Sequence, residues 1–138
     1  MATETLAVKL CAPERRMVEL SAQEIILPGE DGVFTVLPAH TALLSTLQAG
    51  VLMVYDDQAE VTFYALSGGF AEVRDDRVTV LADTLEAGQH IDLDRAQAAR
   101  ERAEQRLAKP GEETDVFRAE LALHRALARI SAHQETGY

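Results

Sequence analysis

The sequence predicts a mainly β N-terminal domain, built as a sandwich or flattened barrel, followed by a C-terminal antiparallel hairpin of two helices. Short apolar or alternating runs separated by turn residues fill the chain from Leu6 to Ala82, a spacing typical of such β folds. Beyond Gly88, β-branched residues become scarce and the helix formers Ala, Gln, Glu and Arg dominate. We therefore expect a β domain at residues 1–87 and a helical hairpin at residues 88–138.

The predicted strands are short runs of apolar and β-branched residues bounded by turn residues. Pro28-Gly29-Glu30-Asp31-Gly32 is a strong turn cluster, and residues 56–59 and 75–76 are predicted to close two hairpins. Thr41–Leu47 fits either a short helical turn or another strand, and both alternatives stay open. The strands expected are Leu6–Leu10, Met17–Leu20, Gln23–Leu27, Val33–Leu37, Val51–Tyr55, Val61–Leu66, Phe70–Arg74 and Arg77–Leu81.

Two helices follow, each with its own start and stop signals. The first is expected from residues 91–92 to Leu107, capped by Asp92 and ended by Lys109-Pro110-Gly111. The second is expected from about Asp115 to Ser131, with Thr114 as its cap. A short breaker between two helices implies an antiparallel pair.

The apolar faces of the two helices are rich in alanine, which allows close approach but buries little area. At about 25 cal/mol per Å² of buried apolar surface, we expect the hairpin to be weakly held and able to move. The apolar lines are Ala96, Ala99, Ala103 and Leu107 on the first helix, and Val116, Ala119, Leu123, Leu127 and Ile130 on the second.

One arginine pattern occurs in both helices, with steps of seven and then four residues. At about 100° per residue, each trio lies within roughly 40° of one line on its helix. Glutamates near these arginines also fit a solvated, ion-paired helix face. The two trios are Arg95, Arg102 and Arg106, and Arg118, Arg125 and Arg129.

The charge balance excludes several classes of partner. The 138 residues carry a formal net charge of -10, which opposes general binding to nucleic acid or to anionic lipid. Most of the acidity lies in the β domain, because residues 1–88 hold five cationic and fourteen acidic side chains. No run is long and apolar enough for a transmembrane helix, and Met1–Thr5 does not resemble the start of a signal peptide. Any membrane association is therefore expected to come through a partner.

No catalytic or metal-binding constellation is visible. The four histidines are scattered without metal-ligand spacing, and no phosphate-loop or zinc-protease motif occurs. The single cysteine, Cys11, is read as a small buried hydrophobe. Gly68-Gly69 is read as a bulge or turn, and the aspartate pairs 56–57 and 75–76 as solvated turn residues. We therefore expect no catalytic residues, no metal site and no enzyme activity in this chain.

The order of these features resembles the epsilon subunit of F-type ATP synthases, over nearly the whole chain. The resemblance rests on several segments taken together in order. They are Gly32 to Leu44 with Leu37-Pro38-Ala39-His40, Leu66 to Asp83 with Ser67-Gly68-Gly69-Phe70, Ile91-Asp92-Leu93-Asp94-Arg95-Ala96, and residues 118–126. The chain departs from common family usage in the 33–42 loop, where relatives often have Gly at Thr35 and Ala39 and Pro at Ala42, and sometimes an acidic residue at Val33.

The resemblance implies a coupling and regulatory subunit of the rotor stalk. Its partners would be the gamma subunit, the ring of c subunits and the catalytic alpha/beta head, with the membrane reached only through this complex. The helical hairpin would lie folded on the sandwich or extend along gamma, where it hinders ATP hydrolysis. Because no transit peptide is evident, the expected location is the cytoplasmic face of a bacterial plasma membrane. The coupling ion, H⁺ or Na⁺, is not specified by the sequence.

The resemblance also implies a regulatory ATP site on the folded hairpin, with or without Mg²⁺. Bacterial members often carry an I/L-D-x-x-R-A signature, which here is Ile91, Asp92, Arg95 and Ala96. Triphosphate charge suits several guanidinium donors, whereas Arg106 and Arg118 are assigned to surface charge. By the same resemblance, residues joining the signature are Glu86, Arg102, Arg125 and Arg129.

His40 is matched to a region that touches gamma in relatives, and a loop histidine bonded to nearby backbone is the equal alternative. A purely structural stalk adaptor without nucleotide sensing remains the second functional reading. A small-molecule enzyme using the sandwich has no catalytic constellation to support it.

Overall fold

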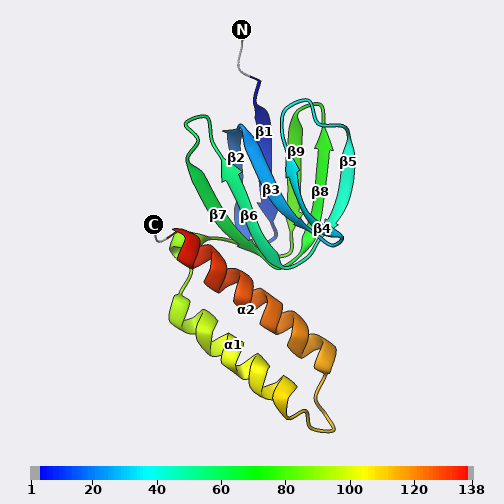
Figure 1. Cartoon of the computed structure of the whole chain (residues 1–138), viewed down its shortest axis with the longest axis vertical. Coiled ribbons are helices and arrows are strands. Elements are labelled where there is room, and N and C mark those ends of the chain that lie inside the picture. Colours follow the sequence, from blue (N-terminus) through cyan, green and yellow to red (C-terminus); the bar gives the residue numbers. More distant parts are fainter. Residues whose placement is uncertain (1–3, 137–138) are drawn as a thin grey trace.

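The protein consists of a β-sandwich with two antiparallel helices below it (Figure 1). The computed structural model describes residues 4–136, apart from the side chains at positions 15 and 16. The predicted sandwich followed by a helical hairpin is confirmed. Its ten strands are β1 Leu6–Ala12, β2 Arg15–Ala22, β3 Glu24–Gly29, β4 Gly32–Val36, β5 Leu43–Leu47, β6 Gly50–Tyr55, β7 Val61–Leu66, β8 Gly69–Arg74, β9 Arg77–Ala82 and β10 Leu85–Ala87.

The strands form one continuous sheet that folds over its own core. Its order is β10-β7-β6-β3-β5-β8-β9-β1-β2, with β4 paired to β3. The β1–β9 pair is parallel and the other pairs are antiparallel. Successive side chains of a strand point to opposite faces of the sheet, one toward the core and one toward solvent. In β1, Leu6, Val8 and Leu10 are buried whereas Ala7 and Lys9 are exposed. The core is therefore built from the inward residues of both layers.

Two features of the sandwich were not specified by the strand patterns. The open Thr41–Leu47 stretch is a strand, Leu43–Leu47, paired with β8. The short strand β10, Leu85–Ala87, was not predicted; it pairs with β7 through Leu85↔Leu66 and its neighbours.

Cys11 is half-buried in β1 rather than buried as the sequence had suggested.

Asp76 is more than a solvated turn residue. Its carboxylate accepts a hydrogen bond of 2.6 Å from the Ala39 amide, and its carbonyl accepts one of 2.9 Å from the Ala7 amide. The β8–β9 turn thus joins β1 to the loop before β5. Ala39 has a φ of +67°, a left-handed conformation that favours glycine.

The helices begin at aspartate caps. Helix α1, Leu93–Ala108, is capped by Asp92, whose Oδ1 accepts from the Arg95 amide at 3.1 Å, as predicted. Helix α2, Val116–Thr136, is capped by Asp115, whose Oδ1 accepts from the Arg118 amide at 3.0 Å. The predicted Thr114 cap is wrong, because its hydroxyl instead accepts from the Gly111 amide within the loop. Helix α2 also extends beyond Ser131.

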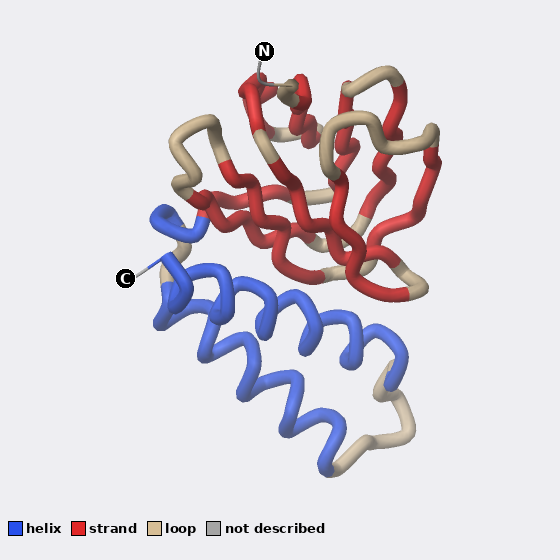
Figure 2. Tube along the Cα trace, turned by 45° about the horizontal axis from the view of Figure 1, so that its top comes forward, coloured by secondary structure: helices blue, strands red, loops and turns tan. Residues whose placement is uncertain are grey.

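Helix α2 lies between α1 and the sandwich (Figure 2). It therefore buries a wider face than the single apolar line predicted, and that line is partly wrong: Val116 and Leu127 are exposed. Part of this face joins Ala65 of β7 and Ile91 in a second core cluster, packed against Val51 and Phe63. The buried residues of α2 are Ala119, Ala126, Ala128, Ile130 and Ala132.

Replacing Ala39 by glycine should stabilise the sandwich. The left-handed φ costs an L-residue about 1–2 kcal/mol, offset in part by the greater freedom of glycine in the unfolded chain. We expect Ala39→Gly to raise the free energy of unfolding by about 0.5–1 kcal/mol in urea denaturation. Ala42→Gly, in the same loop but without a positive φ, is the control and should give no gain. Equal effects of both variants would contradict this explanation.

Candidate functional site

A pocket of about 360 Å³ opens between the sandwich and the hairpin. Its volume is within the range of ordinary small-molecule sites. Three of the residues predicted for the nucleotide site, Glu86, Arg125 and Arg129, lie in its wall. The complete lining is Ala65, Leu66, Ser67, Thr84, Glu86, Ala99, Ala122, Arg125, Ala126 and Arg129.

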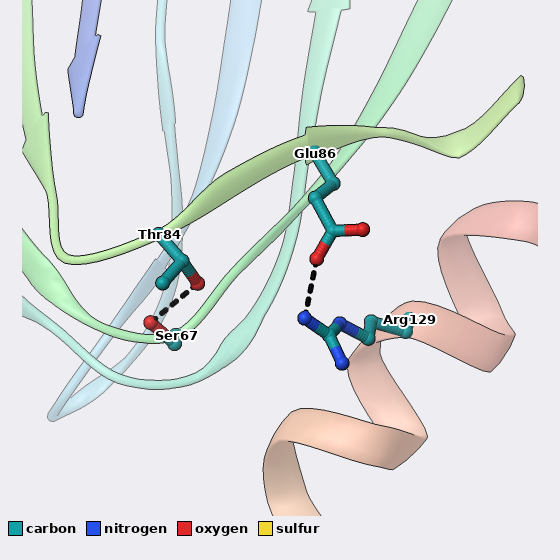
Figure 3. A network of polar contacts seen from close by, with 4 residues as sticks. All are labelled: Ser67, Thr84, Glu86 and Arg129. Carbon is teal, nitrogen blue, oxygen red and sulfur yellow. Dashed lines mark hydrogen bonds and ion pairs between the residues drawn. The ribbon is translucent and has the colours of Figure 1, made fainter. Parts of the chain in front are cut away.

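An ion pair between Glu86 and Arg129 crosses from the sandwich to the hairpin (Figure 3). Glu86 Oε1 in β10 lies 2.5 Å from Arg129 Nη2 in α2, and the two side chains are 34% and 38% exposed. At this exposure, solvent screening limits the contribution to about 1 kcal/mol or less. The pair therefore sets the position of α2 on β10 more than it strengthens the docking.

Arg125 supplies a cation without a countercharge. It lies one turn before Arg129 on α2 and lines the same pocket, but it makes no ion pair or hydrogen bond with the described residues 4–136. A guanidinium in this condition can offer its donors to a carboxylate or phosphate ligand.

The predicted arginines of α1 lie outside the pocket wall. Ala99 is the α1 residue that lines it. Arg95 and Arg102 precede and follow Ala99 by four and three residues, so they share its helix face. Arg102 lines a separate hollow near the hairpin loop together with Arg106 and other polar residues. The structure thus brings Arg125 and Arg129 together with Glu86, whereas Arg95 and Arg102 are not part of the pocket wall.

Two further predicted residues have structural roles. Ile91 is buried in the cluster beneath α2, and Asp92 uses one carboxylate oxygen to cap α1. Neither lines the pocket. Ser67 and Thr84 do line it, although neither was predicted for the site, because both lie in links between strands that only the folded sheet places beside α2.

His40 lies far along the chain from this pocket, in the loop before β5. Its Nδ1–H donates to the Thr41 carbonyl at 2.7 Å, and the side chain is half-buried. This is the local backbone bond that one of its two sequence readings expected. Its contact with a partner subunit stays a prediction.

The last turn of α2 rests on the linker between sandwich and hairpin, the short 3₁₀ helix Gly88–His90. The His133 Nδ1–H donates to the Gly88 carbonyl at 3.2 Å. A Cβ at position 88 would overlap Thr136 Oγ1 and the Ala132 carbonyl oxygen. Only glycine lets α2 approach the linker this closely.

The fold defines a class of two-part protein, in which an alanine-rich helical hairpin folds against a β-sandwich. Among residues 4–136, no group of His, Cys, Asp and Glu is placed to hold a metal. No helix in that range is long and apolar enough to cross a membrane.

Comparison with known proteins places this architecture in one family. Residues 5–88 match the beta-sandwich domain of the ATP synthase delta/epsilon chain, and residues 89–134 match its long alpha-helix domain. The chain therefore belongs to the ATP synthase delta/epsilon chain family. It is of the epsilon type, a non-catalytic subunit of the central stalk of F-type ATP synthase.

Individual relatives agree with this assignment. The ATP synthase epsilon chain of Desulfitobacterium hafniense is 48% identical over 128 residues, which cover 93% of this chain and 96% of the relative. That of Moorella thermoacetica is 43% identical, with the same coverage. A chain in the cryo-EM structure of Euglena gracilis mitochondrial ATP synthase shares the fold, with a TM-score of 0.82 at 23% identity over 93% of this chain and 81% of that one.

Replacing Gly88 by alanine should release the hairpin from the sandwich. The added Cβ overlaps the last turn of α2, and overpacking of this kind costs about 1–3 kcal/mol. We expect amide hydrogen exchange in α2 to accelerate about tenfold or more, while exchange in the sandwich core is unchanged.

Gly111→Ala is the matched control, because a Cβ there meets only Thr114 Oγ1 at 3.6 Å. Equal exchange in α2 for both variants would show that the Gly88 contact does not limit docking.

Proposed function

We propose that this chain couples the rotor stalk to the c-subunit ring through its sandwich and regulates ATP hydrolysis through its hairpin, which binds ATP in the folded state. The observation that carries the proposal is the pocket between sandwich and hairpin, where Arg125 and Arg129 face Glu86. Two guanidinium groups on one face of α2 suit the charge of a triphosphate.

The composite nature of the pocket links ATP to the hairpin position. Its walls come from the sandwich, α1 and α2, so the complete site exists only when the hairpin is docked. A ligand that binds one state alone shifts the population toward that state. ATP, free or bound to Mg²⁺, would therefore hold the hairpin folded, and low ATP would release it to act as a brake on hydrolysis.

The sandwich offers a surface for the stalk partners. On the outer face of adjacent strands, Phe70 of β8 pairs directly with Leu81 of β9, and β5 carries Leu44 beside β8. These three side chains are 52%, 55% and 72% exposed. An apolar group of this kind marks a protein interface. By family analogy, the partners are the gamma subunit, the c ring and the alpha/beta head, with the complex at the cytoplasmic face of a bacterial plasma membrane.

A purely structural adaptor is the second candidate. The apolar group of Leu44, Phe70 and Leu81 belongs to the sandwich, and the core of the sandwich is separate from the cluster beneath α2. The sandwich could therefore bind its partners with the hairpin acting only as a brace.

Titration of ATP into the full chain tests the nucleotide site. By calorimetry, with and without Mg²⁺, wild type should bind ATP, and Arg125→Ala should bind at least about tenfold more weakly, because a hydrogen bond to a charged group is lost. Arg129→Ala should lower the affinity for ATP further, because the Glu86 carboxylate is then left without its partner and beside the phosphates. Arg118→Ala, on the same helix but at the hairpin-loop hollow, is the control. No heat at millimolar ATP, or equal affinities throughout, would exclude the site.

Removal of residues 89–138 tests the brake. Because the sandwich has its own core, residues 1–88 should still assemble with the stalk, and ATP hydrolysis by the reassembled complex should rise severalfold at low ATP. The control is the complex with the full chain at saturating ATP. Unchanged hydrolysis with normal assembly would favour the structural adaptor.

A further inference from the structure

The sandwich side of the pocket carries two hydroxyl groups that lie outside the predicted nucleotide residues. Ser67 is in the link between β7 and β8, and Thr84 is in the link between β9 and β10. Both line the 360 Å³ pocket, and Figure 3 shows them bonded to each other next to the Glu86–Arg129 pair. They form the wall opposite the arginines of α2.

This hydroxyl pair is held rigidly by the backbone. The Ser67 amide donates to the Thr84 carbonyl at 3.3 Å, and the Asp83 amide donates to the Gly68 carbonyl at 2.9 Å. Gly68 and Gly69 have φ values of +127° and +142°, and a Cβ at Gly69 would overlap the Leu81 carbonyl. The two glycines therefore bring the links together, and the hydroxyls are positioned before any ligand arrives.

The pair has a hydrogen-bond donor to spare. Two hydroxyls carry two protons, and Thr84 Oγ1 donates one of them to Ser67 Oγ at 2.7 Å, which leaves the proton of Ser67. The other proton has no acceptor among the side chains and backbone that the structure describes. One O–H is therefore free to donate to a ligand.

The charges around the pair indicate which part of a nucleotide it meets. Two hollows flank the Glu86–Arg129 pair, and both include Thr84. The hollow that contains Ser67 has two arginines and one glutamate in its wall. The other, of about 550 Å³, has three carboxylates and one arginine. Phosphate is repelled by the second and attracted by the first, so the free donor faces the phosphate side.

We propose that the Ser67–Thr84 hydroxyl pair donates a hydrogen bond to a phosphate oxygen of the bound nucleotide and is a determinant of its affinity. The proposal rests on the ATP-binding function proposed above. It adds two residues of the sandwich to a nucleotide site that otherwise consists of hairpin residues and Glu86. It also gives the docked state a contact to the ligand that an extended hairpin cannot complete.

The test is calorimetric titration of the full chain carrying both Ser67→Ala and Thr84→Val. Loss of one hydrogen bond to a charged acceptor should weaken ATP binding about tenfold. The loss should be equal for ATP, 2′-deoxy-ATP and 3′-deoxy-ATP, because the acceptor is a phosphate oxygen. The matched control carries Ser21→Ala and Thr62→Val, two exposed strand positions outside the pocket, and should bind like wild type.

The outcomes separate this inference from the function on which it rests. If wild type binds no ATP, the nucleotide function itself fails. If wild type binds but the Ser67/Thr84 double variant binds equally well, only the hydroxyl role is overturned. A loss that disappears with either deoxynucleotide would assign the pair to the ribose and overturn the phosphate contact. A loss that comes with faster amide exchange in α2 would overturn it too, because the pair would then act by holding the hairpin.

Discussion

The close packing of α2 against the sandwich is the contact on which the rest of this structure depends. Alanines at 128 and 132 let the helix lie directly over β6 and β7, and Ala119 and Ala126 let α1 pack from the other side. Small side chains bring backbones together but bury little apolar area, so the free energy of docking is modest. Gly88 meets the last turn of α2, so the linker helps to fix where the hairpin lies, together with the Glu86–Arg129 pair. The hairpin release proposed above would therefore have only this modest free energy to overcome.

The pocket is a product of that docking. Its arginines belong to α2, its glutamate and hydroxyls belong to the sandwich, and α1 contributes Ala99. None of these elements has the complete set alone. A ligand that contacts the complete set would therefore stabilise the docked hairpin by the free energy of those contacts. Docking of the hairpin would in turn raise the affinity for the ligand by the same factor. The Glu86–Arg129 pair keeps the two sides aligned, while Arg125 leaves a net positive charge for an anionic ligand.

The two core clusters bear on the proposal that one small chain combines a fixed part with a movable part. The sandwich core is closed by its own strands, from Leu10 of β1 to Leu66 of β7, and does not include hairpin residues. The second cluster, around Ala65 and Ile130, lies between the sandwich and α2. Separation of the hairpin would expose this second cluster but leave the first intact. The proposed movement of the hairpin would therefore leave the core of the sandwich unchanged.

Local patterns in the sequence determined the elements of this protein, and the tertiary structure decided how they meet. Alternation along each strand, turn residues such as Asp75 and Asp76, and the Asp92 cap are local signals, so the sandwich and helices could be predicted from them. Strand β10 is too short for a pattern, and the choice of Asp115 over Thr114 as cap depends on loop geometry. The arginine spacing predicted two equivalent stripes, because spacing determines only where a residue lies around its own helix. Which arginines face a pocket depends on how α2 lies against the sheet, and that packing selects Arg125 and Arg129 and places Ser67 and Thr84 across from them.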